Sequence, residues 1–139
     1  MPLTWPVGIA GDFHGVLDRR TGDFIRFTRT AGGATIAPEE HIAAADAHAA
    51  AGVDWDTAVE ESELLSADGA DYDREDYLAG RSSPLLFTSA ALNFGVNQLL
   101  DVLVGLAPAP SGGRDADGNS RPCEAPFSAF VFKVQAGMD

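Results

Sequence analysis

The stretch LLFTSAALNFGVNQLLDVLVGLAP, residues 85–108, predicts the fold class most directly. It begins within the apolar run PLLFTS (84–89), whose shortness and lack of alternation are typical of a strand buried on both faces of a sheet. The apolar residues that follow have helical spacing: Val96, Leu99, Leu100 and Leu103. Asn93 is a candidate N-cap, and Gly105 and Pro108 end the helix. A buried strand that leads through a Ser-Ala turn into a helix is half of an α/β unit, so we expect an α/β fold.

Upstream of this stretch, the sequence predicts strands and then helices. LTWPV (3–7) predicts one strand, and FHGVLDRRTGDFIRFT (13–28) predicts a hairpin with its turn at residues 20–23. PEEHIAAADAHAAAG (38–52) predicts a helix, because proline and two glutamates fill a first turn and glycine follows an alanine-rich body. Residues 54–76 contain ten acids and one base, which predicts a solvated region of helix and loop.

The C-terminal part has a different pattern. PAPSGGRDADGNSRPCEAP (108–126) predicts a flexible linker, and FSAFVFKVQ (127–135) predicts a strand that is apolar on both faces. A core strand without a following partner is an exposed edge, so we expect the chain to be cut inside a second domain. The same edge predicts self-association of the chain through its last strand.

Composition restricts the function classes. The 139 residues are 45% hydrophobic and 22% charged, as in ordinary globular domains. The net charge of −12 repels phosphates and anionic lipids, so we expect no direct DNA binding. The first residues lack the basic and apolar regions of a signal peptide, and no apolar run reaches the roughly 20 residues that span a bilayer, so we expect neither a targeting segment nor a membrane anchor. With Cys123 as its single cysteine, the chain is expected to be cytoplasmic and not associated with a membrane.

No side chain is a convincing catalytic or metal-binding candidate. His41 and His48 lie seven residues apart on the expected helix, roughly 10 Å along its axis, too far to share one metal ion. His14 has no acid partner identifiable from the sequence. The segment from Asp115 begins like a calcium loop, but the positions that require glycine and glutamate hold other residues, Ser120 and Pro126. We therefore expect no catalytic residue and no metal site.

Four stretches carry a family resemblance: LTWPVG, FHGVLDR, YLAGRSSPLLFTSAALNFGVNQLLDVLVGLAPAP and FSAFVFKVQAGMD. In order and approximate spacing they resemble the peptide chain release factor 3 family, the translational GTPases of bacterial termination, and FVFKVQAGMD is the most specific of them. The resemblance implies that residues 1–108 form the C-terminal part of a P-loop GTPase domain with an inserted α+β subdomain. Residues 109–126 would be a linker, and residues 127–139 would begin a translation-factor β-barrel domain.

The same resemblance implies a site at the Ser-Ala turn. Ser89, Ala90 and Ala91 match the family's guanine-recognition turn, and the carboxyl end of a parallel strand is where α/β proteins place ligands. The complete family protein binds GTP or GDP with Mg²⁺ and uses GTP to dissociate stop-codon-reading release factors from the ribosome.

The phosphate loop, the switch regions and the Asn-Lys-x-Asp motif precede the matched region in the family. The one lysine here, Lys133, does not follow a Gly-x-x-x-x-Gly pattern. We therefore expect no cofactor and no GTPase activity for this chain alone. The alternative from another functional class is a stand-alone acidic protein-binding module without nucleotide chemistry.

Overall fold

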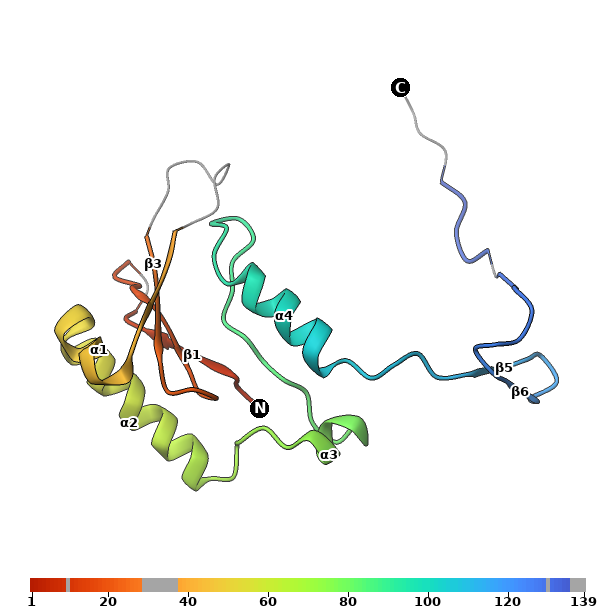
Figure 1. The fold of residues 1–139 in the computed structure, drawn as a ribbon, viewed down its shortest axis with the longest axis horizontal. Helices are drawn as coiled ribbons and strands as arrows, with labels where there is room; N and C mark the ends of the chain where they lie inside the picture. Colours follow the sequence, from red (N-terminus) through yellow and green to blue (C-terminus); the bar gives the residue numbers. More distant parts are fainter. Residues whose placement is uncertain (10, 29–37, 130, 136–139) are drawn as a thin grey trace. The chain divides into compact units, whose positions relative to one another are not determined.

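The computed structural model describes residues 1–9, 11–28, 38–129 and 131–135. The chain divides into two compact units, Met1–Ala107 and Pro108–Asp139, which are described separately (Figure 1). None of the helices in the described residues is long and apolar enough to cross a membrane.

An antiparallel sheet is the framework of the first unit. Its four strands pair in chain order: β1 (Thr4–Val7), β2 (Gly15–Asp18), β3 (Phe24–Phe27) and β4 (Glu39–Ile42). The expected hairpin is confirmed, because β2 pairs with β3 around the turn that follows Asp18. Leu17 lies opposite Phe24, and Val16 lies opposite Ile25. Since neighbouring side chains of a strand point to opposite faces, these two pairs contribute to different faces of the sheet.

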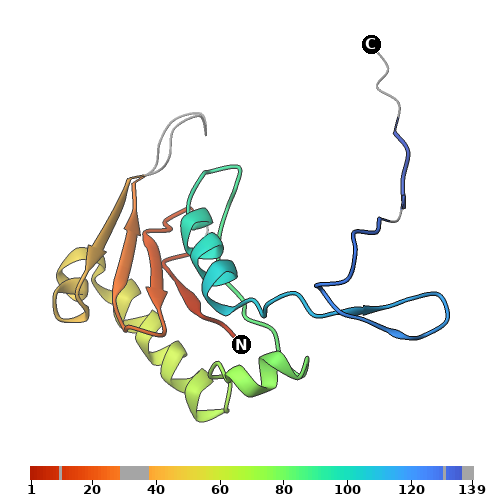
Figure 2. The same ribbon diagram turned by 45° about the vertical axis from the view of Figure 1, so that its right-hand side comes forward.

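Two helices cover one face of the sheet. Helix α1 (Ala44–Ala51) and helix α2 (Val53–Ala67) lie together on this side in both views (Figures 1 and 2). The core between them and the sheet consists of Val7, Leu17, Phe24, Ala47, Trp55 and Ala58. The rings of Phe24 and Trp55 pack with their centroids 5.6 Å apart. This core is the main apolar contact of the unit.

The helix expected from residue 38 begins later. Residues Glu39–Ile42 form β4 instead, and Arg26 of β3 pairs with Glu40 both in strand register and through an ion pair. Pairing with β3 thus outweighs the local helix signals of this segment, because tertiary contacts override propensity. The helix ends as expected, at Gly52, whose φ of +57° suits glycine.

The acidic region has the expected organisation of helix and loop. It contains most of α2 and the short helix α3 (Arg74–Leu78). The Asp73 carboxylate caps α3 by accepting a hydrogen bond of 2.8 Å from the Asp76 amide.

The strand expected at residues 84–89 is not formed. The segment makes isolated bridges only, a parallel one between Pro2 and Leu85 and an antiparallel one between Ser89 and Phe94. Leu85 is half-exposed, whereas Phe87 packs against the second face of the sheet beside Phe94. The apolar run is therefore covered on one side at most. The expected α/β class is confirmed in its coarser form, a mixed α/β unit with an antiparallel sheet.

Helix α4 (Val96–Leu106) lies where the helical spacing of the apolar residues predicted a helix. Its N-cap is Gly95 rather than Asn93, which adopts a φ of +57° in the preceding turn. The buried residues of α4 are Gln98 and Val102, whereas Leu99, Leu100 and Leu103 are exposed. The amide nitrogen of Gln98 donates to Glu39 of β4 over 2.8 Å, which fixes this side of the helix toward the sheet.

The second unit contains a small hairpin where a linker was expected. Strands β5 (Gly113–Arg114) and β6 (Ser120–Arg121) pair, and the Asp115 carboxylate accepts hydrogen bonds from the amides of Asp117 and Asn119 in the turn between them. These bonds, led by the one from Asn119, hold the pKa of Asp115 below its usual value. The residues that resembled a calcium loop thus close a turn with their own hydrogen bonds.

The strand expected at residues 127–135 is also not formed in the described part of that segment. Phe127, Val131, Phe132 and Val134 are largely exposed. The described part of this segment therefore presents exposed apolar side chains without a paired strand, and self-association of the chain stays a prediction.

Candidate functional site

The candidate site is the turn at residues 89–94, where the structure places all three predicted site residues. Ser89 and Phe94 exchange two backbone hydrogen bonds of 3.0 Å, which close the loop between them. The Ser89 hydroxyl accepts a further bond of 3.2 Å from the Leu92 amide, and the Ala90 carbonyl accepts one of 3.3 Å from the Asn93 amide. The turn therefore has a defined backbone although it does not follow a regular strand.

Two main-chain donors of this turn are unused. Among the described residues, the amides of Ala90 and Ala91 have no hydrogen-bond acceptor, and both residues are exposed. Their methyl side chains leave the backbone open to a ligand. Because an exposed amide donates readily to a carbonyl or an anionic oxygen, the turn can hold an acceptor group of a ligand.

Aromatic residues fasten the turn to the sheet on both sides. Before the turn, the Phe87 amide donates to the buried hydroxyl of Thr4 over 3.0 Å. After the turn, the Phe94 ring packs against Phe13 and Phe27 with centroid distances of 4.8 and 5.2 Å. Gly95 has a φ of +71°, and a Cβ there would lie 3.0 Å from the Thr88 side chain. These contacts position the turn without using Ala90 or Ala91.

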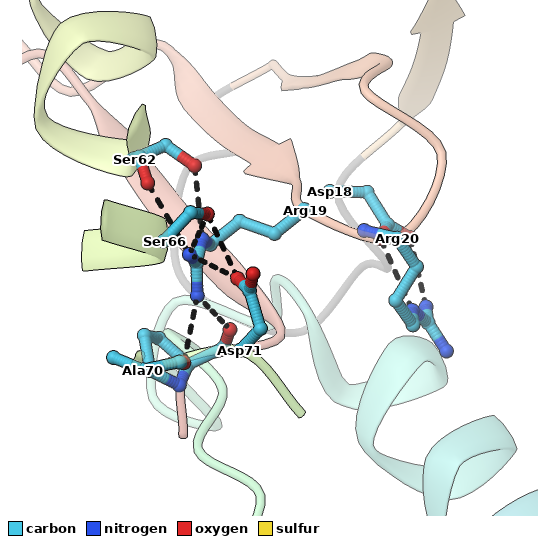
Figure 3. Close-up of polar contacts among 8 residues, drawn as sticks. Asp18, Arg19, Arg20, Ser62, Ser66, Ala70 and Asp71 are labelled. Atoms are coloured by element: carbon cyan, nitrogen blue, oxygen red, sulfur yellow. Dashed lines mark hydrogen bonds and ion pairs between the residues drawn. The ribbon is translucent and has the colours of Figure 1, made fainter. Parts of the chain in front are cut away.

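The densest polar network of the unit lies elsewhere and surrounds Arg19. This side chain is 5% exposed, and Figure 3 shows it reaching from the end of β2 toward α2 and the loop that follows. Its guanidinium donates to the carbonyls of Pro2, Ser62 and Ala70, the hydroxyls of Ser62 and Ser66, and the carboxylate of Asp71. Every acceptor belongs to the protein itself, so the network holds elements together and leaves no donor directed at a ligand.

Next to it, Asp18 and Arg20 form a partly buried ion pair of 2.8 Å (Figure 3). Burial by itself raises the pKa of Asp18, but hydrogen bonds from Arg20 and Thr21 and the Arg20 charge outweigh it. The pKa of Asp18 therefore lies below its usual value. The same pair raises the pKa of Arg20, mainly through the hydrogen bond to Asp18.

The histidines differ from expectation in two respects. His14 does have an acid partner, since its Nε2 lies 3.1 Å from an oxygen of Asp54 at the start of α2. The two residues are 40 positions apart, so no local signal could reveal the contact. His41 lies in β4 and not on the helix that carries His48, which pairs with Asp56 at 2.8 Å.

A mixed α/β unit with an antiparallel sheet is compatible with part of a GTP-binding translation factor. No family model matches the chain. Three curated relatives match nearly all of it, and each is named peptide chain release factor 3. Identity is 41% to the protein of Gloeobacter violaceus, 40% to that of Symbiobacterium thermophilum and 38% to that of Nitrosomonas europaea.

These matches cover 99 to 100% of the chain but only 26 to 27% of each relative. The chain thus spans about a quarter of the length of the curated relatives it matches. The resemblance inferred from the motifs is confirmed: the chain is homologous to a segment of peptide chain release factor 3.

Proposed function

We propose that the chain is part of a translation-termination GTPase of the release factor 3 type, and that its turn at Ser89–Ala91 contacts the guanine base. One observation supports this assignment above the others. The chain matches a segment of release factor 3 over 99% of its own length, and the predicted site residues form a turn in it. Two backbone donors of this turn, in exposed residues, are unused among the described residues.

The chemistry of guanine fits these donors. The base carries a carbonyl oxygen that accepts hydrogen bonds, whereas adenine has an amino group at the same position. The amides of Ala90 and Ala91 therefore favour guanine over adenine. Phosphate and Mg²⁺ contacts supply most of the affinity and the catalysis in GTPases of this class, and we assign them to the part of the protein that precedes the matched segment in the family.

In the complete factor, GTP binding would drive the dissociation of stop-codon-reading release factors from the ribosome. The present segment would contribute base recognition through its turn. Its own residues are not proposed to carry out hydrolysis.

The test replaces the matching segment of the Gloeobacter violaceus relative by this chain and measures GDP affinity. Ala90→Pro removes one amide donor and pushes Ser89 toward extended geometry. The loss of one buried hydrogen bond costs about 1–3 kcal/mol, so we expect roughly 5- to 150-fold weaker GDP binding. Ala90→Gly keeps the donor and serves as the matched control.

The outcomes separate the proposal from a purely connecting turn. Thermal melts establish that each chimera is folded. Equal GDP affinity of the Ala90→Pro and Ala90→Gly chimeras would contradict base recognition by this turn. The isolated chain, tested with a fluorescent GDP analogue, is expected to show no micromolar binding.

A second candidate function is the acidic protein-binding module. It is supported by α2, which exposes Asp56, Glu60, Glu61 and Glu63 and packs onto the sheet with its other side. A folded chimera that fails to bind GDP at all would favour this candidate.

A further inference from the structure

We propose that Asp12, His14 and Asp54 bind a divalent transition-metal ion, with Zn²⁺ as the representative. The ligand atoms of these three side chains all lie within 4.8 Å of one another. They join the loop between β1 and β2 to the first turn of α2. The inference departs from the sequence-based expectation of no metal site, and it does not depend on the nucleotide-binding proposal.

The loop geometry brings the first two ligands together. The His14 amide donates to the Val7 carbonyl over 2.9 Å, and the Asp12 amide donates to the Ile9 carbonyl over 2.9 Å. Gly8 has a φ of +88°, and a Cβ there would lie 2.1 Å from the Asp12 carbonyl oxygen. Only glycine fits this approach of the backbone, so the residue at position 8 is part of what sets the spacing between Asp12 and His14.

The distances suit a small ion. His14 Nε2 lies 3.1 Å from a carboxylate oxygen of Asp54 and 3.8 Å from one of Asp12. Around a tetrahedral ion with bonds of about 2.0–2.2 Å, neighbouring ligand atoms are about 3.3–3.6 Å apart, between the two observed values. Asp12 is the most exposed of the three and can turn toward the ion, and the remaining coordination positions are left to water.

The donor set identifies the class of ion. One imidazole nitrogen and two carboxylate oxygens are ligands for Zn²⁺ and similar divalent ions, whereas Cu(I) prefers the sulfur ligands that are missing here. Two carboxylates beside a neutral imidazole also carry two negative charges, which a divalent ion balances.

A second histidine provides the comparison. His48 pairs with Asp56 at 2.8 Å, which is a simple pair of one histidine and one carboxylate. His14 has two carboxylates within 4.0 Å. The carboxylate of Asp12 thus gives His14 a second acidic neighbour, as a site for a dication requires.

The experiment titrates Zn²⁺ into the whole metal-stripped chain by calorimetry and follows Co²⁺ by its visible absorption, which reports coordination. We expect binding of one ion per chain and a higher melting temperature with Zn²⁺, because an ion that binds only the folded state stabilises it. His14→Gln and Asp54→Asn should each weaken binding at least about 10-fold, since even outer-shell changes cost this much. His48→Gln is the matched control and should leave the affinity unchanged.

Two results with the first set of variants would overturn the proposal, and a third comes from Asp12→Asn. One is the lack of one-to-one Zn²⁺ binding at micromolar concentration, and the other is an equal loss of affinity in the His14→Gln and His48→Gln proteins. Should Asp54→Asn fail to fold, Asp12→Asn takes its place, because this exposed loop residue contributes little to packing. Unchanged Zn²⁺ affinity in a folded Asp12→Asn protein would also contradict the three-ligand site.

Discussion

Two regions of the first unit contain large apolar side chains but bury them to different extents. In the sheet and its helices, Phe24 is fully buried and Trp55 is 5% exposed. In α4, Leu100 and Leu103 are 52% and 59% exposed. An apolar stripe therefore marks the side of a helix or strand whose burial would stabilise the fold. That side becomes buried only where another surface of the protein packs against it.

The length of chain between pairing segments also separates the β2–β3 hairpin from the apolar run that precedes α4. The turn between β2 and β3 is short, so the cost in chain entropy of pairing Leu17 with Phe24 is small. The apolar run at residues 84–89 needs a partner strand from far along the chain, and the described residues offer it one parallel bridge, at Pro2. Predictions of stability follow from this contrast.

The largest expected effect comes from a matched pair of truncations. Phe24→Ala removes a fully buried ring from its contact with Trp55 and should destabilise the protein by about 3–5 kcal/mol. Leu103→Ala removes an exposed side chain and should change the stability by no more than about 0.5 kcal/mol. Urea denaturation of both variants is the measurement. Similar losses in the two proteins would show that the exposed face of α4 is covered in solution.

An intermediate effect is expected at Arg19, which binds the sheet to α2 through polar contacts. Arg19→Ala leaves partly buried acceptors such as the Pro2 carbonyl without a donor and should cost about 2–3 kcal/mol. Arg19→Lys retains the charge but not the planar set of donors, so it should recover only part of the loss. Thermal melts of the two variants and the parent rank their stabilities. An Arg19→Lys protein as stable as the parent would contradict a role for the planar guanidinium donors.

The smallest effect concerns the Asp18 pair and depends on pH. The pKa of Asp18 is lower in the folded protein than its ordinary value of 3.8, so the ionised form stabilises the fold. This contribution is complete above the ordinary value and is lost as the pH falls through the lower pKa of the folded state. The Asp18→Asn protein should therefore be less stable than the parent at neutral pH. The difference in free energy of unfolding between the two proteins should become smaller below about pH 4. Denaturation curves of both proteins at several pH values test this. A difference in stability that does not change with pH would contradict the lowered pKa of Asp18.

Local sequence signals were sufficient for some of the fold. The hairpin could be predicted because its strands and turn lie within 16 consecutive residues, 13–28, and pair with each other. The end of α1 at Gly52 could be predicted because a glycine with positive φ is a local property. For the same reason, the turn at Ser89 could be located from its small residues and flanking apolar segments.

The remaining features depend on contacts between distant residues. The segment Glu39–Ile42 has a helical pattern but becomes a strand, because β3 offers it a ladder of hydrogen bonds. His14 and Asp54 meet across 40 residues of chain, so the histidine looks unpartnered in the sequence.

By itself, the sequence predicted the hairpin and the position of the candidate turn, because each depends on residues close together in the chain. It also predicted the resemblance to peptide chain release factor 3, which the similarity to the three relatives supports. Tertiary structure alone decided which face of α4 is buried and that Asp12, His14 and Asp54 come together. It also decided that the amides of Ala90 and Ala91 meet no acceptor within the described part of the chain. The physical reason is that burial, unpaired donors and ligand clusters are properties of surfaces in contact, and the chain forms those surfaces only when it folds.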